Sequence, residues 1–160
     1  MADGESVLSV IAAEVKPRGL PSSYPAIFRP LVAGREKRVL GDLFGLANFG
    51  VNYTRLAPGS QSALLHRHAK QDEFVYILEG SPTLVTEAGE TLLGPGHCAG
   101  FKAGSHRAHY LANRSDREVV YLEIGDRTAG DSVLYPDDDV RADHIDGSWR
   151  FTHKDGTPFT

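Results

Sequence analysis

Short apolar runs separated by turns dominate the chain from residue 44 onward. The turns carry glycine, proline and asparagine, for example at Pro58-Gly59 and Gly94-Pro95-Gly96. We expect strands over residues 48–56, 63–68, 74–78, 83–86, 90–93, 98–102, 108–112 and 118–124. Many short strands with turn signals at this spacing are typical of a β-sandwich or a β-barrel. The pattern therefore predicts an all-β domain.

The segments on either side of these runs have a different character. Residues 1–39 hold several prolines, which argue against a long helix or a central strand. Ile27 and Phe28 are nevertheless too apolar for a free tail. We therefore divide the chain into an N-terminal arm (1–39), a barrel (40–126) and a C-terminal tail (127–160) that packs on the barrel.

Side-chain alternation in the run 74–78 leads to a prediction about assembly. Successive side chains on a strand point to opposite faces of the sheet. If Glu73 faces the interior, the outward set is entirely apolar and consists of Phe74, Tyr76 and Leu78. A monomer rarely exposes so much contiguous apolar surface. We expect a homodimer in which these faces meet and the N-terminal arms help to cover them.

Composition and charge narrow the classes of partner. With 160 residues the chain is long enough for one domain with a buried core, and its formal net charge of -4 gives no basic footprint for nucleic acid. No apolar run reaches the length of a membrane span, and the N-terminus lacks the features of a signal peptide. Cys98 is the single cysteine, which excludes an intramolecular disulfide and is compatible with a reducing compartment. We expect a cytoplasmic protein whose partner is a small-molecule substrate, with no nucleic acid and no membrane.

Three histidines and one glutamate form a pattern that suits a metal ion. His66 and His68 are two positions apart, so on a strand both side chains point to the same face. Glu73 follows at hairpin distance, and His109 lies in a later run. Imidazole and carboxylate together suit one divalent transition metal such as Fe, Mn, Zn or Ni. Glu73 could alternatively stay off the metal and act as a catalytic general base.

Tyr53 and Arg55 are the candidate substrate-binding residues. They share a parity in the run before the histidines, and a guanidinium matches a carboxylate or a phosphate. If they face the interior, they would bind an anionic substrate; the alternative is that Arg55 faces outward. Asn113, by contrast, lies at a strand end before a turn, where amides bond the backbone, and we expect it to be structural.

The first histidine cluster carries a family resemblance. The spacing Gly59-x6-His66-x-His68-x4-Glu73-x6-Gly80 resembles the first motif of the cupin superfamily, with one extra residue after the first glycine. The resemblance implies a double-stranded β-helix, which is a jelly-roll barrel, with a metal in its mouth. It also implies that the two histidines and the glutamate are metal ligands.

A second spacing, Gly104-x4-His109-x3-Asn113, resembles the second cupin motif, although Lys102 stands where the family usually has proline. It implies that His109 is the remaining metal ligand. Segments outside the barrel resemble a group of small bacterial single-domain cupins that are sometimes labelled sugar-phosphate-isomerase-like. The wider resemblance therefore suggests one class of substrate without naming a particular one.

The resemblance implies a metal-dependent isomerase or epimerase that acts on a small polar or anionic metabolite. An iron-dependent dioxygenase is the close alternative, and a non-catalytic, metal-assisted binding or sensing module is the third. The sequence contains no Gly-x-Ser-x-Gly nucleophile elbow and no phosphate-binding glycine-lysine loop. Metal identity and turnover are the measurements that separate the three functions.

Overall fold

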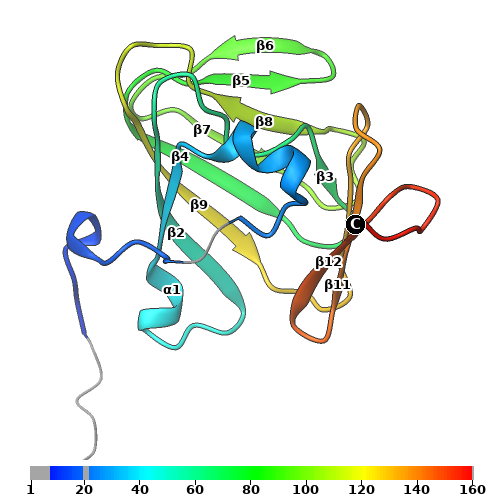
Figure 1. Ribbon diagram of the computed structural model, residues 1–160. Coiled ribbons are helices and arrows are strands. Elements are labelled where there is room, and N and C mark those ends of the chain that lie inside the picture. Colours follow the sequence, from blue (N-terminus) through cyan, green and yellow to red (C-terminus); the bar gives the residue numbers. More distant parts are fainter. Residues whose placement is uncertain (1–7, 20–21, 160) are drawn as a thin grey trace, which may run out of the picture.

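The computed structural model describes residues 8–19 and 22–159, and within them the protein is built mostly of strands (Figure 1). The first nine strands are β1 (Arg35–Val39), β2 (Phe49–Leu56), β3 (Arg67–His68), β4 (Glu73–Glu79), β5 (Thr83–Thr86), β6 (Gly89–Leu92), β7 (Cys98–Phe101), β8 (His109–Ala112) and β9 (Val119–Asp126). Three more follow, namely β10 (Ser132–Leu134), β11 (Arg141–Ile145) and β12 (Ser148–Thr152). The described helical segments are short, namely η1 (Ala12–Glu14), η2 (Ala26–Val32) and α1 (Leu40–Leu43). Within the described ranges, no helix is long and apolar enough to cross a membrane.

The strands form antiparallel sheets that make up the predicted jelly-roll barrel. The largest sheet has the order β1-β2-β9-β4-β7, and the smaller ones have the orders β12-β11-β10-β3 and β6-β5-β8. An isolated bridge between His66 and His109 links the β3 side of one small sheet to the β8 side of the other. The all-β prediction is therefore confirmed, and two residues of the predicted metal site are directly paired through their backbones.

One apolar cluster lies between the large sheet and the strands that face it. It consists of Leu56, Val75, Ile77, Leu93, Leu111, Val119 and Tyr121. In β4, Val75 and Ile77 are 3% and 0% exposed, whereas Phe74 and Tyr76 are both 39% exposed, so the predicted alternation is confirmed. Leu78 is only half-buried, because a register shift beyond Ile77 interrupts the alternation at the end of the strand.

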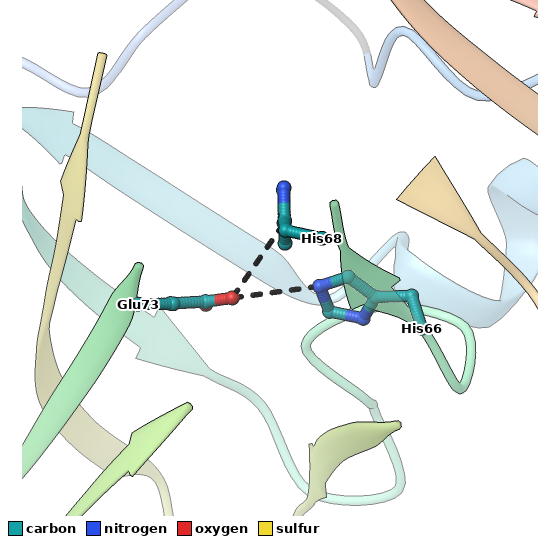
Figure 2. Close-up of side chains that lie close together, drawn as sticks. All are labelled: His66, His68 and Glu73. Atoms are coloured by element: carbon teal, nitrogen blue, oxygen red, sulfur yellow. Dashed lines mark ion pairs between the residues drawn. The ribbon is translucent and has the colours of Figure 1, made fainter. Parts of the chain in front are cut away.

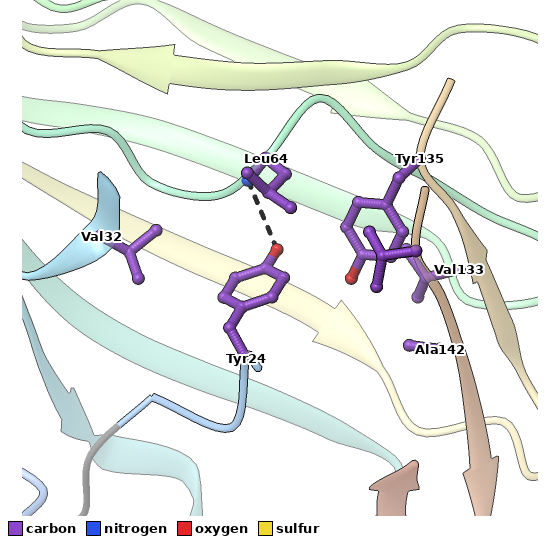
Figure 3. Close-up of a cluster of buried hydrophobic side chains, with 7 residues drawn as sticks. Tyr24, Val32, Leu64, Val133, Tyr135 and Ala142 are labelled. Atoms are coloured by element: carbon purple, nitrogen blue, oxygen red, sulfur yellow. Dashed lines mark hydrogen bonds between the residues drawn. The ribbon is translucent and has the colours of Figure 1, made fainter. Parts of the chain in front are cut away.

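The N-terminal arm packs against the C-terminal strands (Figure 3). A second apolar cluster brings arm and tail together, and its members are Tyr24, Val32, Leu64, Val133, Tyr135, Val140 and Ala142. The Leu64 backbone N–H donates to the Tyr24 hydroxyl over 3.4 Å. The arm therefore helps to enclose the barrel mouth, while Phe74 and Tyr76 stay exposed on the outer face of the large sheet.

The segments at either end of the barrel also contribute strands, which the hydrophobic pattern did not predict. β1 lies in the segment assigned to the arm and pairs with β2 along its whole length. β10 lies in the segment assigned to the tail and pairs with β3, so the tail continues the sheet that carries His68. The run 63–68 is mostly an irregular loop, and only its last two residues form a strand.

Gly80, which ends the histidine–glutamate spacing, is required by the backbone. Its φ is 80°, a left-handed conformation that favours glycine. A Cβ at this position would lie 2.6 Å from the carbonyl oxygen of Glu118, just before β9. The glycine therefore lets the end of β4 approach the start of β9, the strand beside it in the large sheet.

Candidate metal site

Three of the four predicted ligands, His66, His68 and Glu73, meet in the barrel mouth (Figure 2). One carboxylate oxygen, Glu73 Oε2, lies 3.5 Å from His66 Nε2 and 3.7 Å from His68 Nε2. The same oxygen lies 3.1 Å from His109 Nε2. The sequence places these residues on separate segments, and the antiparallel pairing of the barrel brings their polar atoms to one point.

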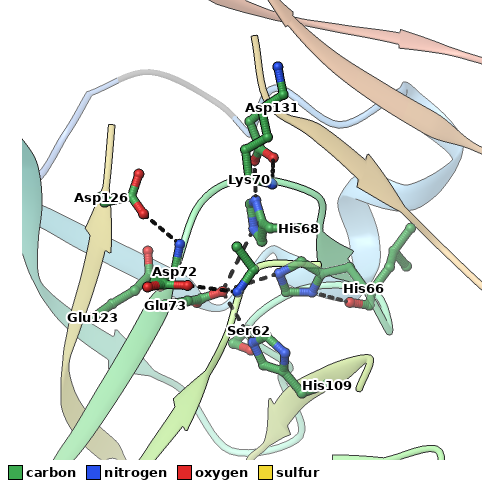
Figure 4. Close-up of polar contacts among 12 residues, drawn as sticks. Ser62, His66, His68, Lys70, Asp72, Glu73, His109, Glu123, Asp126 and Asp131 are labelled. Atoms are coloured by element: carbon green, nitrogen blue, oxygen red, sulfur yellow. Dashed lines mark hydrogen bonds and ion pairs between the residues drawn. The ribbon is translucent and has the colours of Figure 1, made fainter. Parts of the chain in front are cut away.

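The loop between His68 and Glu73 is held by two aspartates outside it, Asp126 and Asp131 (Figure 4). The Lys70 backbone N–H donates to Asp131 Oδ1 over 2.7 Å, and the Asp72 backbone N–H donates to Asp126 Oδ2 over 2.6 Å. Both contacts cross more than fifty residues of sequence. They fix the turn that carries the glutamate back toward the histidines.

Hydrogen bonds on the far side of two rings point their Nε2 atoms at the glutamate. His66 Nδ1 donates to the Leu64 carbonyl over 2.9 Å, because a carbonyl can only accept. His68 Nδ1 lies 2.6 Å from Asp131 Oδ2, and the Asp131 side chain is fully buried. A metal-ligating histidine commonly donates its other ring N–H to a carboxylate or a carbonyl in this way. The neutral form of each ring therefore has its free lone pair on Nε2.

His109 is held differently. The Phe101 ring stacks on it with centroids 3.3 Å apart and planes 1° from parallel. Its Nδ1 is buried and has no hydrogen-bond partner within the described residues. Stacking and the bridge to His66, rather than a hydrogen bond at Nδ1, therefore hold the ring in place, and its Nε2 is bonded to Glu73 Oε2 over 3.1 Å.

Burial and the neighbouring charges set the protonation of the cluster. Burial raises the pKa of Glu73, but hydrogen bonds from His109 and His66 and their charges outweigh it, so the pKa of Glu73 lies well below its ordinary value. Burial holds the pKa of His109 below its ordinary value, although the bond to Glu73 opposes this. Burial also acts to lower the pKa of His68, yet the bond to Asp131 and the charge of Glu73 raise it overall. At neutral pH the glutamate is thus an anion and His109 is neutral, which are the forms that ligate a metal.

The donor set fits a divalent transition metal. Ligand atoms of His66, His68 and Glu73 all lie within 4.8 Å of one another, so this triad could hold an ion. Neutral imidazoles with one carboxylate suit Fe, Mn, Ni or Zn better than a hard cation such as Ca²⁺. A buried carboxylate is also costly without a compensating positive charge, and a bound cation would supply it.

The cluster forms part of the wall of a cavity of about 800 Å³. The arm and the C-terminal segments give this cavity its aromatic lining, which comprises Tyr24, Tyr135, Trp149 and Phe151. The large sheet gives it a polar lining that includes Arg35, Lys37, Asn52 and Glu123. The Tyr135 ring lies 6.1 Å from that of His66, and the Trp149 ring lies 6.0 Å from that of His68. The candidate ligands are therefore open to a chamber large enough for a small metabolite.

Comparisons with known proteins agree with this geometry. The cupin domain family matches residues 52–125. A crystal structure from Silicibacter pomeroyi, described as a sugar phosphate isomerase from a cupin superfamily, is 39% identical, has a TM-score of 0.89 and covers 95% of this chain and 96% of its own. The chain belongs to the cupin superfamily. The predicted family and fold are confirmed.

Two further structures show how far the likeness extends. A proposed sugar phosphate isomerase from Acidithiobacillus ferrooxidans is 33% identical to this cupin, with a TM-score of 0.69, and covers 74% of this chain and 76% of its own. The polyketide cyclase RemF from Streptomyces resistomycificus is 20% identical, with a TM-score of 0.62 and coverage of 75% and 79%, which shows a shared fold alone. No curated protein matches the chain.

The cavity of this cupin does not include the predicted substrate residues Tyr53 and Arg55. Their neighbours Gly50 and Asn52 line it from β2 instead. Arg55 pairs with Glu118 over 2.6 Å at the exposed surface, and Tyr53 lies under the Arg38 guanidinium, 5.7 Å from the ring centroid. Arg55 therefore faces outward, the alternative that the sequence left open, and neither side chain lines the cavity, because β2 presents its other set of positions to the interior.

Asn113 of the second cupin motif has the geometry expected of a structural residue. Its Nδ2 donates to the Leu56 carbonyl over 2.8 Å and to the Arg117 carbonyl over 2.7 Å. Its Oδ1 accepts the Ser115 hydroxyl over 2.7 Å. These bonds tie the end of β8 to β2 and to the turn before β9, and they leave no polar atom of the amide directed at the metal site.

Sequence reasoning missed Asp131 and Arg35, which both contribute to the site. Asp131 has no motif around it that could have marked it, because its role depends on the pairing of β10 with β3. Arg35 stands in the charged segment that precedes β2, and that segment was interpreted as part of the arm rather than as a strand. Residues 35–38 are all charged and show no apolar/polar alternation, so no local pattern marked β1 as a strand.

Proposed function

We propose that this cupin is a metal-dependent enzyme that acts on a small polar or anionic metabolite, with isomerase or epimerase chemistry. The observation that carries the proposal is the convergence of three histidine Nε2 atoms on one oxygen of Glu73, beside a cavity of about 800 Å³. The two similar proteins described as sugar phosphate isomerases, at 39% and 33% identity, support the reaction class.

In this proposal His66, His68 and Glu73 hold one divalent metal, and His109 is the fourth ligand. The metal supplies Lewis-acid polarisation of a substrate carbonyl or hydroxyl. Asp131 keeps His68 in the tautomer that presents Nε2 to the site. The aromatic lining of the cavity excludes water around the reacting carbons.

Glu73 has two roles open to it. As a ligand it contributes the negative charge that its low pKa provides at neutral pH. As a general base it would accept a proton from a substrate carbon or hydroxyl within hydrogen-bond reach. Its contacts to three imidazoles favour ligation, because a free base needs a lone pair directed into the cavity.

The first test is metal analysis of protein purified without added metal. We expect one divalent transition metal per chain in the wild type, and loss of that metal in His66→Ala and His68→Ala with the fold retained by circular dichroism. His106→Ala is the matched control, because this histidine is exposed on the loop before β8. Unchanged metal content in a His66→Ala/His68→Ala double variant would show that the site assignment is wrong.

The second test is turnover of the metal-loaded protein on a panel of aldose and ketose phosphates, followed by proton exchange in NMR spectra. Isomerase or epimerase chemistry should exchange a substrate C–H proton with solvent. Oxygen uptake with a bound iron would instead assign the dioxygenase alternative. Ligand binding with neither exchange nor oxygen uptake would assign the non-catalytic binding module.

A further inference from the structure

Arg35 carries a positive charge on the cavity wall that no side chain balances within the described residues. The side chain is half-buried, and its Nη1 donates to the backbone carbonyl of Ser62. The other cations of β1 are compensated, because Lys37 pairs with Glu123 and Arg38 pairs with Glu36. A guanidinium has five N–H donors, so Arg35 retains several that are directed at no protein carboxylate.

The position of Arg35 relates it to the metal site. Ser62, which accepts its hydrogen bond, also accepts the Leu111 backbone N–H through its hydroxyl over 2.9 Å. Leu111 lies two residues after His109 on β8. The guanidinium and the histidine cluster are therefore attached to adjoining segments of the cavity wall. Arg35, His66, His68 and Glu73 all line the cavity, whereas His109 is more deeply buried.

The charge of Arg35 reaches the tyrosines of the cavity and the core. Burial raises the pKa of Tyr24, Tyr121 and Tyr135, and the charge of Arg35 acts in the opposite direction on all three. Two of these tyrosines, Tyr24 and Tyr135, line the cavity together with Arg35. Arg18 and Arg29 add exposed cations to the lining, and Arg29 Nε is bonded to the Tyr24 carbonyl over 2.9 Å.

We propose that Arg35 is the anchor for the oxyanion end of the substrate, a terminal phosphate or carboxylate, and that it holds the rest of the molecule toward the histidine–glutamate cluster. A guanidinium binds either group through two parallel hydrogen bonds, which fixes orientation as well as position. This inference rests on the proposed function for the role of the anchored molecule. It replaces Arg55, which the fold places outside the cavity.

The test is a calorimetric titration of the full-length protein with inorganic phosphate and, separately, with malonate. Each titration is run on protein as purified and again after EDTA treatment, so that binding to Arg35 is separated from binding to a metal. We expect saturable binding of at least one anion that survives EDTA. Arg35→Gln should weaken it about tenfold or more, the loss typical of a charge-assisted hydrogen bond. Arg35→Lys serves as the second variant. It keeps the positive charge but lacks the two parallel N–H donors of the guanidinium, so its loss of anion affinity should be smaller.

Arg55→Gln is the matched control, because it removes an arginine of the same sheet that pairs with Glu118 at the surface. Its anion affinity should equal that of the wild type. The preferred anion identifies the substrate end as phosphate or carboxylate. Equal affinity in Arg35→Gln and wild type, or no saturable binding of either anion, overturns the anchor.

The anchor and the proposed function fail separately. If the protein turns over sugar phosphates but binds phosphate independently of Arg35, the enzymatic proposal stands and the anchoring role of Arg35 is ruled out. Arg35-dependent binding without turnover keeps the anchor and contradicts the enzymatic proposal.

Discussion

Asp131 offers the sharpest test of the site, because one substitution separates metal affinity from stability. Its buried carboxylate accepts a hydrogen bond from His68 Nδ1 over 2.6 Å and from the Lys70 backbone N–H over 2.7 Å. In Asp131→Asn the side-chain oxygen can still accept from Lys70. The amide nitrogen then faces His68 Nδ1 as a donor, which favours the tautomer with the proton on Nε2. That tautomer has no lone pair on Nε2, the atom that would ligate the metal, and its Nδ1 lone pair is occupied by the amide.

The size of the effect follows from these two contacts. Loss of the partner behind a ligating histidine typically weakens metal binding about 10–100-fold, which corresponds to roughly 1.4–2.8 kcal/mol. Asp131→Ala removes the acceptor for Lys70 as well. A buried donor left without an acceptor costs about 1–3 kcal/mol of folding free energy. The asparagine variant should therefore lose metal affinity with little loss of stability, and the alanine variant should lose both.

Metal affinity is measured by competition with a chromogenic chelator, and the free energy of unfolding is measured by urea denaturation of the metal-free proteins. Asp143→Asn is the control, since the Asp143 side chain pairs with Arg141 on β11 and does not line the cavity. Wild-type metal affinity in Asp131→Asn would refute the reasoning, because it would mean that the carboxylate does not set the tautomer of His68.

Three further predictions concern folding, pH and assembly. Asn113→Ala should lower the free energy of unfolding by about 1–3 kcal/mol in urea and leave the metal content unchanged, because its amide bonds only backbone carbonyls and Ser115. Since the pKa of Glu73 is lowered in the folded state, its contribution to the stability of the metal-free protein is present above the ordinary value of 4.5 and lost as pH falls through the folded-state value. In Glu73→Gln the free energy of unfolding should therefore fall less steeply as the pH is lowered. The same pH dependence in the variant and the wild type would contradict this prediction. We also propose a homodimer through the outer face of the large sheet, where Phe74 and Tyr76 are each 39% exposed. Light scattering should give the mass of two chains, with Phe74→Glu weakening the dimer, and a wild-type mass of one chain would rule the proposal out.

The sequence by itself determined the fold class and the candidate metal ligands. Alternation along β4 separated Val75 and Ile77 from Phe74 and Tyr76, because a strand with one apolar interior face has a period of two. The His66–His68 pair and Glu73 could be assigned together because their spacing resembles the first cupin motif, although only His68 of the pair lies in a strand. Both inferences depend on residues close in the chain, for which local geometry is sufficient.

The tertiary structure alone decided which residues surround the site. In β2 both faces carry large or polar residues, so alternation identified two sets without indicating which set faces inward; Asn52 lines the cavity and Arg55 does not. Asp131 reaches His68 across 63 residues, through the pairing of β10 with β3. Arg35 enters the cavity because β1 joins the edge of the large sheet. Each of these placements depends on which distant strands pair, and strand pairing is selected by the burial of the whole barrel rather than by any local pattern.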